Sequence, residues 1–102
     1  MTVGAAFKAI AEPNRREILR LAWNREMSAS ELASHFPMTR QAVSQHVRVL
    51  TSSGLLEERR DGTKRLYRTR QDQVGELQTY LDEFWRTGLE AIKEHAEDQP
   101  NE

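Results

Sequence analysis

The sequence contains no cysteine, and this absence removes several kinds of chemistry at once. Disulfide bonds, thiolate nucleophiles and cysteine-ligated metal sites are all excluded. Long apolar runs are also missing, since none approaches the ~20 residues that a membrane span needs. Residues 1–7 lack a basic segment followed by a long apolar stretch, so no signal peptide is expected. We therefore expect a cytoplasmic protein without a membrane partner.

Catalytic patterns are also scarce. The chain has neither a Ser/His/Asp arrangement nor a glycine-rich phosphate-binding loop, and its three histidines lack metal-ligand spacing. We therefore predict no enzyme activity, no metal site and no cofactor. Hydrophobic residues make up only 37% of the 102 residues. Because a single domain of this size buries roughly two-thirds of its unfolded surface, we expect a second copy to complete part of the apolar surface.

The net charge of −1 conceals a segregation of charge along the chain. Residues 36–70 carry eight basic and three acidic side chains, whereas residues 71–102 carry two basic and nine acidic ones. This separation favours one face that binds nucleic acid and another that is turned away from it. We expect residues 1–96 to form one DNA-binding and dimerisation domain, and the acidic residues 97–102 to be a disordered tail.

The apolar periodicity predicts four helices in the first half of the chain, over residues 3–11, 13–24, 28–35 and 39–53. Ser28 and Glu31 fit a capping box at the start of the third helix. Thr39 is the expected N-cap of the fourth helix, and Gly54 is expected just after its end. Two helices joined by a short turn in this way are typical of a helix-turn-helix.

The second half of the chain begins with a change of period. Residues 55–60 and 64–69 flank Asp61-Gly62-Thr63, and Asp-Gly is a strong hairpin signal because glycine tolerates the positive φ of the turn. This pattern predicts a two-stranded wing with a basic tip, followed by an amphipathic helix over residues 74–96. The expected fold is therefore mainly α: a winged helix-turn-helix of four helices, a β-hairpin and a fifth helix.

The helix over residues 39–53 has the composition of a DNA recognition helix. Val43, Val47 and Leu50 form one apolar stripe, and the opposite face carries Arg, Gln and Ser, which suit hydrogen bonding to base edges in the major groove. The residues expected to contact bases lie at its N-terminal end: Arg40, Gln41, Ser44 and Gln45. Those expected to contact the phosphate backbone lie on this helix and on the wing: Thr39, Arg48, Arg59, Arg60, Lys64 and Arg65.

The last helix carries an apolar stripe that is wider than a solvent-facing helix needs. Part of it is expected to cover the core of the protomer, and part to pair with a second copy together with the first helix. The residues expected at this dimer interface are Phe7, Ile10, Leu77, Leu81, Phe84, Trp85, Gly88 and Ile92. Periodicity alone leaves open which aromatic residues belong to the core, and Trp85 fits either place. A homodimer would bind a roughly palindromic operator in double-stranded DNA.

These residues resemble the ArsR family of winged-helix repressors, and in particular its compact, cysteine-free autorepressors. The resemblance covers roughly residues 5–95 and rests on five segments: 7–19 (FKAIAEPNRREIL), 31–33 (ELA), 41–50 (QAVSQHVRVL), 53–56 (SGLL) and 61–67 (DGTKRLY). It implies a domain that dimerises through its terminal helices and represses transcription by occupying operator DNA.

The resemblance also bears on metal sensing. It places Ser28 and Ser30 at positions where metal sensors of the family carry cysteines, and serine hydroxyls are poor ligands for soft metals. A second family site needs Asp, His and Glu on the last helix, where only His95 with Glu94 and Asp98 is available, so we favour an exposed histidine there. For His46 we favour a partly buried structural role. No effector site is assigned.

The serious alternative is a winged-helix adaptor or co-regulator whose helix face docks a protein instead of DNA. Protein interface cores favour aromatic residues and Met, whereas the exposed helix face here is polar. This composition favours DNA as the partner.

Overall fold

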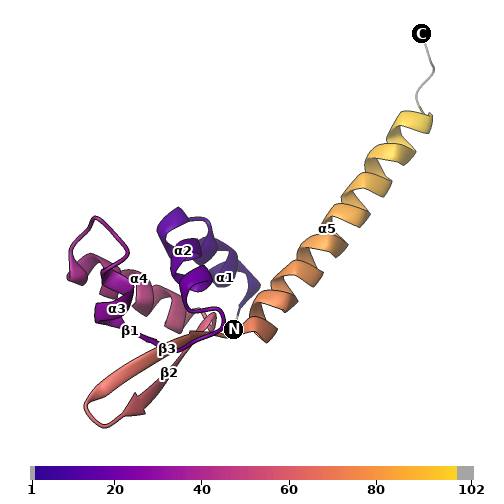
Figure 1. Ribbon diagram of the computed structural model, residues 1–102. Helices are drawn as coiled ribbons and strands as arrows, with labels where there is room; N and C mark the ends of the chain where they lie inside the picture. Colours follow the sequence, from indigo (N-terminus) through magenta and orange to yellow (C-terminus); the bar gives the residue numbers. More distant parts are fainter. Residues whose placement is uncertain (1, 99–102) are drawn as a thin grey trace.

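The computed structural model describes residues 2–98 and consists of five helices with a small antiparallel sheet (Figure 1). In chain order the elements are α1 (Val3–Ile10), α2 (Pro13–Leu21), β1 (Met27–Ser28), α3 (Ala29–Ala33), α4 (Arg40–Ser52), β2 (Leu56–Asp61), β3 (Lys64–Thr69) and α5 (Gln71–Asp98). The predicted winged helix-turn-helix is confirmed, with one additional strand.

Side chains just before the helices hold their first turns. Thr39 is the N-cap of α4, and its hydroxyl accepts a hydrogen bond from the backbone N–H of Ala42 at 3.1 Å. The capping box predicted for α3 is present, because Ser28 Oγ accepts from Glu31 N and Glu31 Oε1 accepts from Ser28 N, both at 3.1 Å. These bonds satisfy backbone donors that a helix start otherwise leaves unpaired.

The sheet contains a strand that the sequence did not predict. β1 pairs antiparallel with β3, with Met27 opposite Tyr67, so the strand order is β1-β3-β2 instead of a two-stranded wing. Two residues are too few to display a strand period, and this explains why β1 was missed. Helix α2 also ends at Leu21, earlier than the predicted residue 24, because the chain turns there to bring β1 alongside β3.

The wing itself forms as predicted. β2 and β3 pair from Leu56 opposite Thr69 to Asp61 opposite Lys64, which leaves a two-residue loop at the tip. Gly62 in this loop has a φ of 64°, a conformation that residues with a side chain rarely adopt.

The core lies between the helices and the base of the sheet, and its largest fully buried side chains are Ile18, Met27, Val43, Leu32, Leu50, Leu55 and Leu56. Strand β3 is fixed to α2 because the Thr69 hydroxyl donates to the carbonyl of Leu19 at 2.8 Å, and the Thr69 N–H donates to the carbonyl of Ala22 at 3.0 Å. Among the described residues, no buried polar side-chain atom lacks a hydrogen-bond partner.

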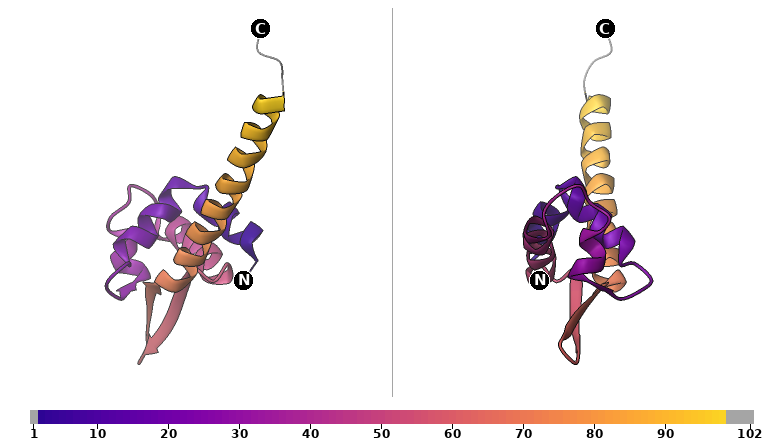
Figure 2. Two further views of the ribbon diagram at one scale, coloured as in Figure 1. Left: turned by 90° about the vertical axis from the view of Figure 1, so that its right-hand side faces the viewer. Right: turned by 60° about the vertical axis from the view of Figure 1, so that its left-hand side comes forward.

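Helix α5 leaves this body as a single long rod, and both views in Figure 2 show its C-terminal part extending beyond the other elements. The described protein therefore measures 67 × 26 × 20 Å. The helix begins three residues before the predicted position and includes Glu97 and Asp98, which the sequence assigned to the tail. Residues 99–102 of that predicted tail lie outside the described residues. No helix among the described residues is long and apolar enough to cross a membrane.

Candidate nucleic-acid interface

Helix α4 is buried along one face and open along the other. Val43, Val47 and Leu50 are buried, as the apolar stripe predicted. On the open face, four of the predicted DNA-contacting side chains are exposed, and Ser44 is partly buried between them. The four exposed residues are Arg40, Gln41, Gln45 and Arg48. The structure thus brings the predicted base-contacting residues together on one surface.

A groove of about 810 Å³ lies between this face and the wing. Arg40, Ser44 and Arg48 of α4 line one side, and Lys64 and Arg65 of β3 line the other. The first residues of α3 form the end of the groove, so that all three parts of the winged helix-turn-helix contribute to it. A groove with basic side chains on both walls is suited to a phosphate backbone.

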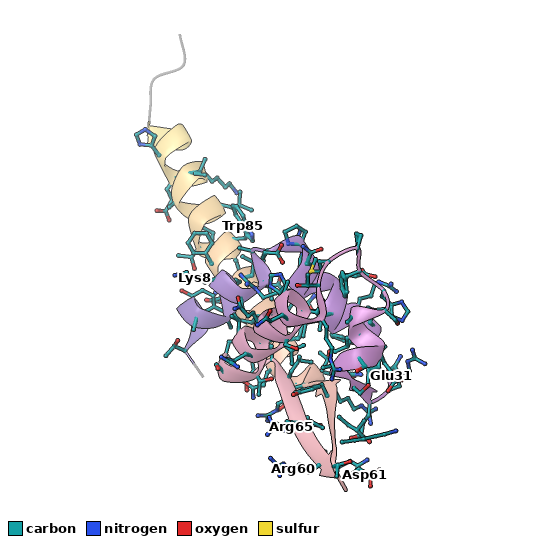
Figure 3. All side chains as sticks on the ribbon, turned by 90° about the vertical axis from the view of Figure 1, so that its left-hand side faces the viewer. Lys8, Glu31, Arg60, Asp61, Arg65 and Trp85 are labelled. Carbon is teal, nitrogen blue, oxygen red and sulfur yellow. The ribbon has the colours of Figure 1, made fainter. Side chains whose placement is uncertain are left out.

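The wing carries four predicted phosphate contacts, and Figure 3 shows Arg60, Arg65 and Asp61 along the hairpin at the end of the molecule away from α5. All four basic residues are exposed. Arg65 Nε lies 3.2 Å from Glu58 Oε1, and Arg59 donates two hydrogen bonds to the carboxylate of Glu26, at 2.7 and 2.9 Å. These hydrogen bonds and the charge of Arg59 hold the pKa of Glu26 below its usual range.

Sequence reasoning missed both acidic partners. The hairpin register contains a signal for Glu58. Arg65 pairs with Arg60, and Glu58, two residues before Arg60 in β2, is therefore a diagonal neighbour of Arg65. Glu26 had no such signal, since it lies 33 residues from Arg59 in the sequence. Solvent screens exposed ion pairs, which therefore contribute little to stability, so a phosphate can replace either carboxylate at little cost.

The apolar stripe of α5 divides into a buried and an exposed part. Leu77 is only 4% exposed because it packs into the core of its own protomer, so it is a core residue and not part of the predicted interface. Phe84 and Trp85 are 56% and 55% exposed, which resolves their position: neither belongs to the protomer core. The other large exposed apolar residues of this helix are Tyr80, Leu81, Leu89 and Ile92.

The remaining residues predicted at the dimer interface surround this exposed part. Phe7 and Ile10 of α1 are partly buried against the core. The ring of Phe7 lies 5.7 Å from that of Tyr80, so α1 rests on the start of the exposed stripe. Gly88 leaves open space at its Cβ position, because no atom outside its own helix lies within 4 Å of it.

The histidines do not form a metal centre in the part of the chain that the structure describes, where no group of three or more His, Asp or Glu is placed to hold an ion. His46 is partly buried, and its Nδ1 lies 3.3 Å from Arg15 Nη1 and 3.9 Å from Glu12 Oε2. The favoured interpretation of His46 as a partly buried structural histidine agrees with these contacts.

Known proteins that are similar in sequence and in structure agree with this fold. The sequence model of a family described as a helix-turn-helix domain matches residues 10–59. An HTH-type transcriptional regulator of Mycobacterium tuberculosis is 37% identical over 84 residues, which are 82% of this chain and 78% of the relative. The structure of an ArsR-like transcriptional regulator from Rhodococcus superposes with a TM-score of 0.77 at 31% identity, over 95% of this chain and 94% of that one.

The chain belongs to the ArsR family of winged helix-turn-helix transcriptional regulators. A further similar structure is the homodimeric winged helix-turn-helix DNA-binding domain of a possible ArsR-family transcriptional regulator from Mycobacterium bovis. It is 28% identical, with a TM-score of 0.67 over 98% of this chain and 86% of that one. These two superpositions cover 95% and 98% of this chain, so the likeness extends beyond the helix-turn-helix to the wing and the terminal helices.

Proposed function

We propose that this ArsR-family protein binds a palindromic operator in double-stranded DNA as a homodimer and represses transcription there. The observation that carries the proposal is the groove between α4 and the wing, because it collects basic side chains from two elements beside an exposed row of Arg, Gln and Ser. A chromosomal operator as the target also implies a cytoplasmic location.

Helix α4 supplies the sequence recognition in this proposal. Arg40 has the donor geometry to bind guanine O6 and N7 together, and Gln41 or Gln45 can pair with adenine through two hydrogen bonds. Ser44 lies in the groove wall between them and can reach either base. Because these side chains occupy the first two turns of the helix, they are the ones that enter the major groove when its N-terminus faces the DNA.

In this proposal the wing and the start of α4 bind the phosphate backbone. These contacts position the protein on the DNA but do not distinguish one base sequence from another. Thr39 and Arg48 flank the base-contacting residues on α4. The positive end of the dipole of α4 also favours an anion near Thr39. Arg59, Arg60, Lys64 and Arg65 extend the positive surface along the hairpin. Arg59 and Arg65 must exchange their carboxylate partners for phosphates if they bind DNA.

The homodimer rests on the exposed part of α5. Six large apolar side chains on one helix form a patch of the kind that monomeric proteins rarely expose. A second copy of the same helix, with α1 beside it, fits this patch, and the relative from M. bovis is homodimeric. A twofold axis through α5 would present two copies of α4 to half-sites about one helical turn, ~34–36 Å, apart.

Repression follows from occupancy in this proposal, because a dimer that covers both half-sites blocks access to the DNA between and around them. An adaptor function is the second candidate. It is disfavoured by the polar, basic lining of the groove, since protein interface cores are depleted in charge.

Selection of bound duplexes from a random library tests the proposal, followed by titration of the selected duplex at two salt concentrations. We expect a palindromic sequence whose affinity falls by about three to five decades over a fourfold rise in salt, if 6–10 phosphates are neutralised. A protein that enriches no sequence and binds duplexes only at background level would instead be an adaptor.

A further inference from the structure

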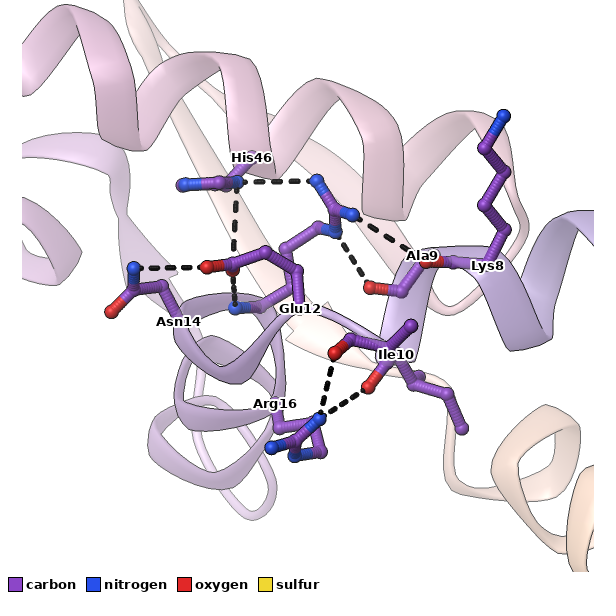
Figure 4. A network of polar contacts seen from close by, with 9 residues as sticks. Lys8, Ala9, Ile10, Glu12, Asn14, Arg16 and His46 are labelled. Carbon is purple, nitrogen blue, oxygen red and sulfur yellow. Dashed lines mark hydrogen bonds and ion pairs between the residues drawn. The ribbon is translucent and has the colours of Figure 1, made fainter.

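The turn between α1 and α2 contains a polar network that reaches the recognition helix (Figure 4). The guanidinium of Arg15 is at its centre. Its Nε donates to the carbonyl of Ala9 at 2.6 Å, its Nη2 to the carbonyl of Lys8 at 3.4 Å, and its Nη1 lies 3.3 Å from Nδ1 of His46. One side chain of α2 therefore contacts the end of α1 and the middle of α4 at the same time.

In the Arg15–His46 contact, only Arg15 is limited to the role of donor. A guanidinium has no acceptor, so this contact is a hydrogen bond when Nδ1 of His46 is the unprotonated, accepting nitrogen of the ring. Glu12 borders the same contact, with Oε2 3.9 Å from His46 Nδ1. The Glu12 carboxylate also accepts from the backbone N–H of Arg15 at 2.9 Å and from the Asn14 side chain at 3.1 Å, so it holds the network at the start of α2.

The network lies on a path between the two surfaces that operator binding needs. On one side, α1 packs on α5 through Phe7 and Tyr80, next to the exposed apolar stripe. On the other side, His46 directly follows Gln45 in α4. Neither Arg15 nor His46 lines the groove between α4 and the wing. We therefore expect these two residues to affect DNA binding through the placement of α4.

We propose that Arg15 and His46 are positioning residues that fix the recognition helix relative to the dimer interface and thereby set the half-site spacing that the protein accepts. This inference rests on the proposed function, because only a dimer on two half-sites has a spacing to set. In such a dimer each copy of α4 is held to the α1 of its own protomer. A change in the angle between α4 and α1 occurs in both protomers, so it alters the distance between the two copies of α4.

The test compares His46→Leu with His46→Gln in the full chain, on the selected operator, on a duplex with one half-site, and on operators lengthened or shortened by one or two base pairs. His46→Leu removes the acceptor but keeps an apolar side chain of similar size. We expect it to lose about 2- to 30-fold in affinity for the operator, to keep its affinity for the single half-site, and to discriminate less between spacings. His46→Gln retains an acceptor for Arg15 and is expected to restore the spacing preference.

Two results would overturn the inference. One is an equal loss on the operator and on the single half-site, which would assign His46 to direct contact or to folding. The other is unchanged affinity and unchanged spacing preference in His46→Leu. Sedimentation and thermal unfolding of both variants separate a folding defect from a positioning defect. Failure of the proposed function is distinguishable, because the wild-type protein would then select no palindrome at all.

Discussion

The guanidinium of Arg59 on strand β2 holds both carboxylate oxygens of Glu26, the residue before β1, across 33 positions of sequence. This pair joins the wing to the start of the helix-turn-helix. It also places a negative charge beside a side chain that we expect to face phosphate. We therefore expect the Arg59–Glu26 pair to compete with DNA for the same arginine while it ties the wing to the residue before β1.

Substitution Glu26→Gln tests this competition. It removes the negative charge but keeps an amide that can still accept a hydrogen bond from Arg59, so the wing should stay folded. We expect operator affinity to rise by several-fold, and the log–log salt dependence to steepen by about 0.9 if Arg59 gains one phosphate. Glu57→Gln, which removes an exposed carboxylate from the same hairpin, is the matched control. Equal gains in both variants would point to net charge instead of release of Arg59.

The separation of base-reading from phosphate-binding residues predicts two different mutant behaviours. Gln45→Ala should cost about 1–3 kcal/mol on the best operator and relax discrimination at particular base pairs, because a bidentate base contact is lost. Arg60→Ala should weaken binding to all sequences alike and reduce the salt slope by about one phosphate. Affinity measured on a panel of single-base operator variants separates the two patterns. Uniform loss in both variants would contradict the assignment.

The parts of the fold that the sequence predicted are those whose determinants lie close together in the chain. The capping box at Ser28 and Glu31 and the turn at Gly62 each depend on a few neighbouring residues, and both formed as predicted. Strand β1 was not predicted, because it pairs with β3, far away in the sequence. A strand of two residues has no period of its own to reveal it.

The candidate site likewise contains features that depend on neighbouring residues and features that depend on tertiary packing. The open face of α4 follows from helical periodicity alone, so Arg40, Gln41 and Gln45 lie together as expected. Periodicity also placed Leu77 and Leu81 on one apolar stripe of α5. It does not predict at which residue α5 stops packing against the rest of the protomer. Leu77 lies before that point and is buried, whereas Leu81 lies beyond it and is 39% exposed. The depth of a residue on an amphipathic helix depends on tertiary packing.

The acid stability of the protein should depend on the capping box of α3. The hydrogen bond from the backbone N–H of Ser28 holds the pKa of Glu31 below its usual range. A carboxyl group with a lower pKa in the folded state stabilises the fold above its unfolded pKa, and this contribution disappears as the pH falls through the folded pKa. We therefore expect the wild-type protein to lose stability below about pH 4.5, and Glu31→Gln to show a shallower loss. Thermal unfolding between pH 3 and 7 measures both, and parallel curves would contradict the expectation.

The exposed part of α5 leads to a prediction about assembly. Phe84→Glu or Leu81→Glu places a charge in the proposed twofold interface, where it would lose water without gaining a partner. We expect monomers at micromolar concentration and loss of specific operator binding, with the fold of the protomer intact because both side chains lie outside its core. Thr79→Glu adds the same charge on the opposite side of α5 and should leave the dimer unchanged. Sedimentation gives the oligomeric state, and a Phe84→Glu variant that remains dimeric would place the interface elsewhere.

Leu77→Ala should behave differently from the Phe84, Leu81 and Thr79 variants, because it removes a side chain that is buried in the core of its own protomer. We expect it to lower the free energy of unfolding by about 2–5 kcal/mol, as thermal or denaturant unfolding would measure.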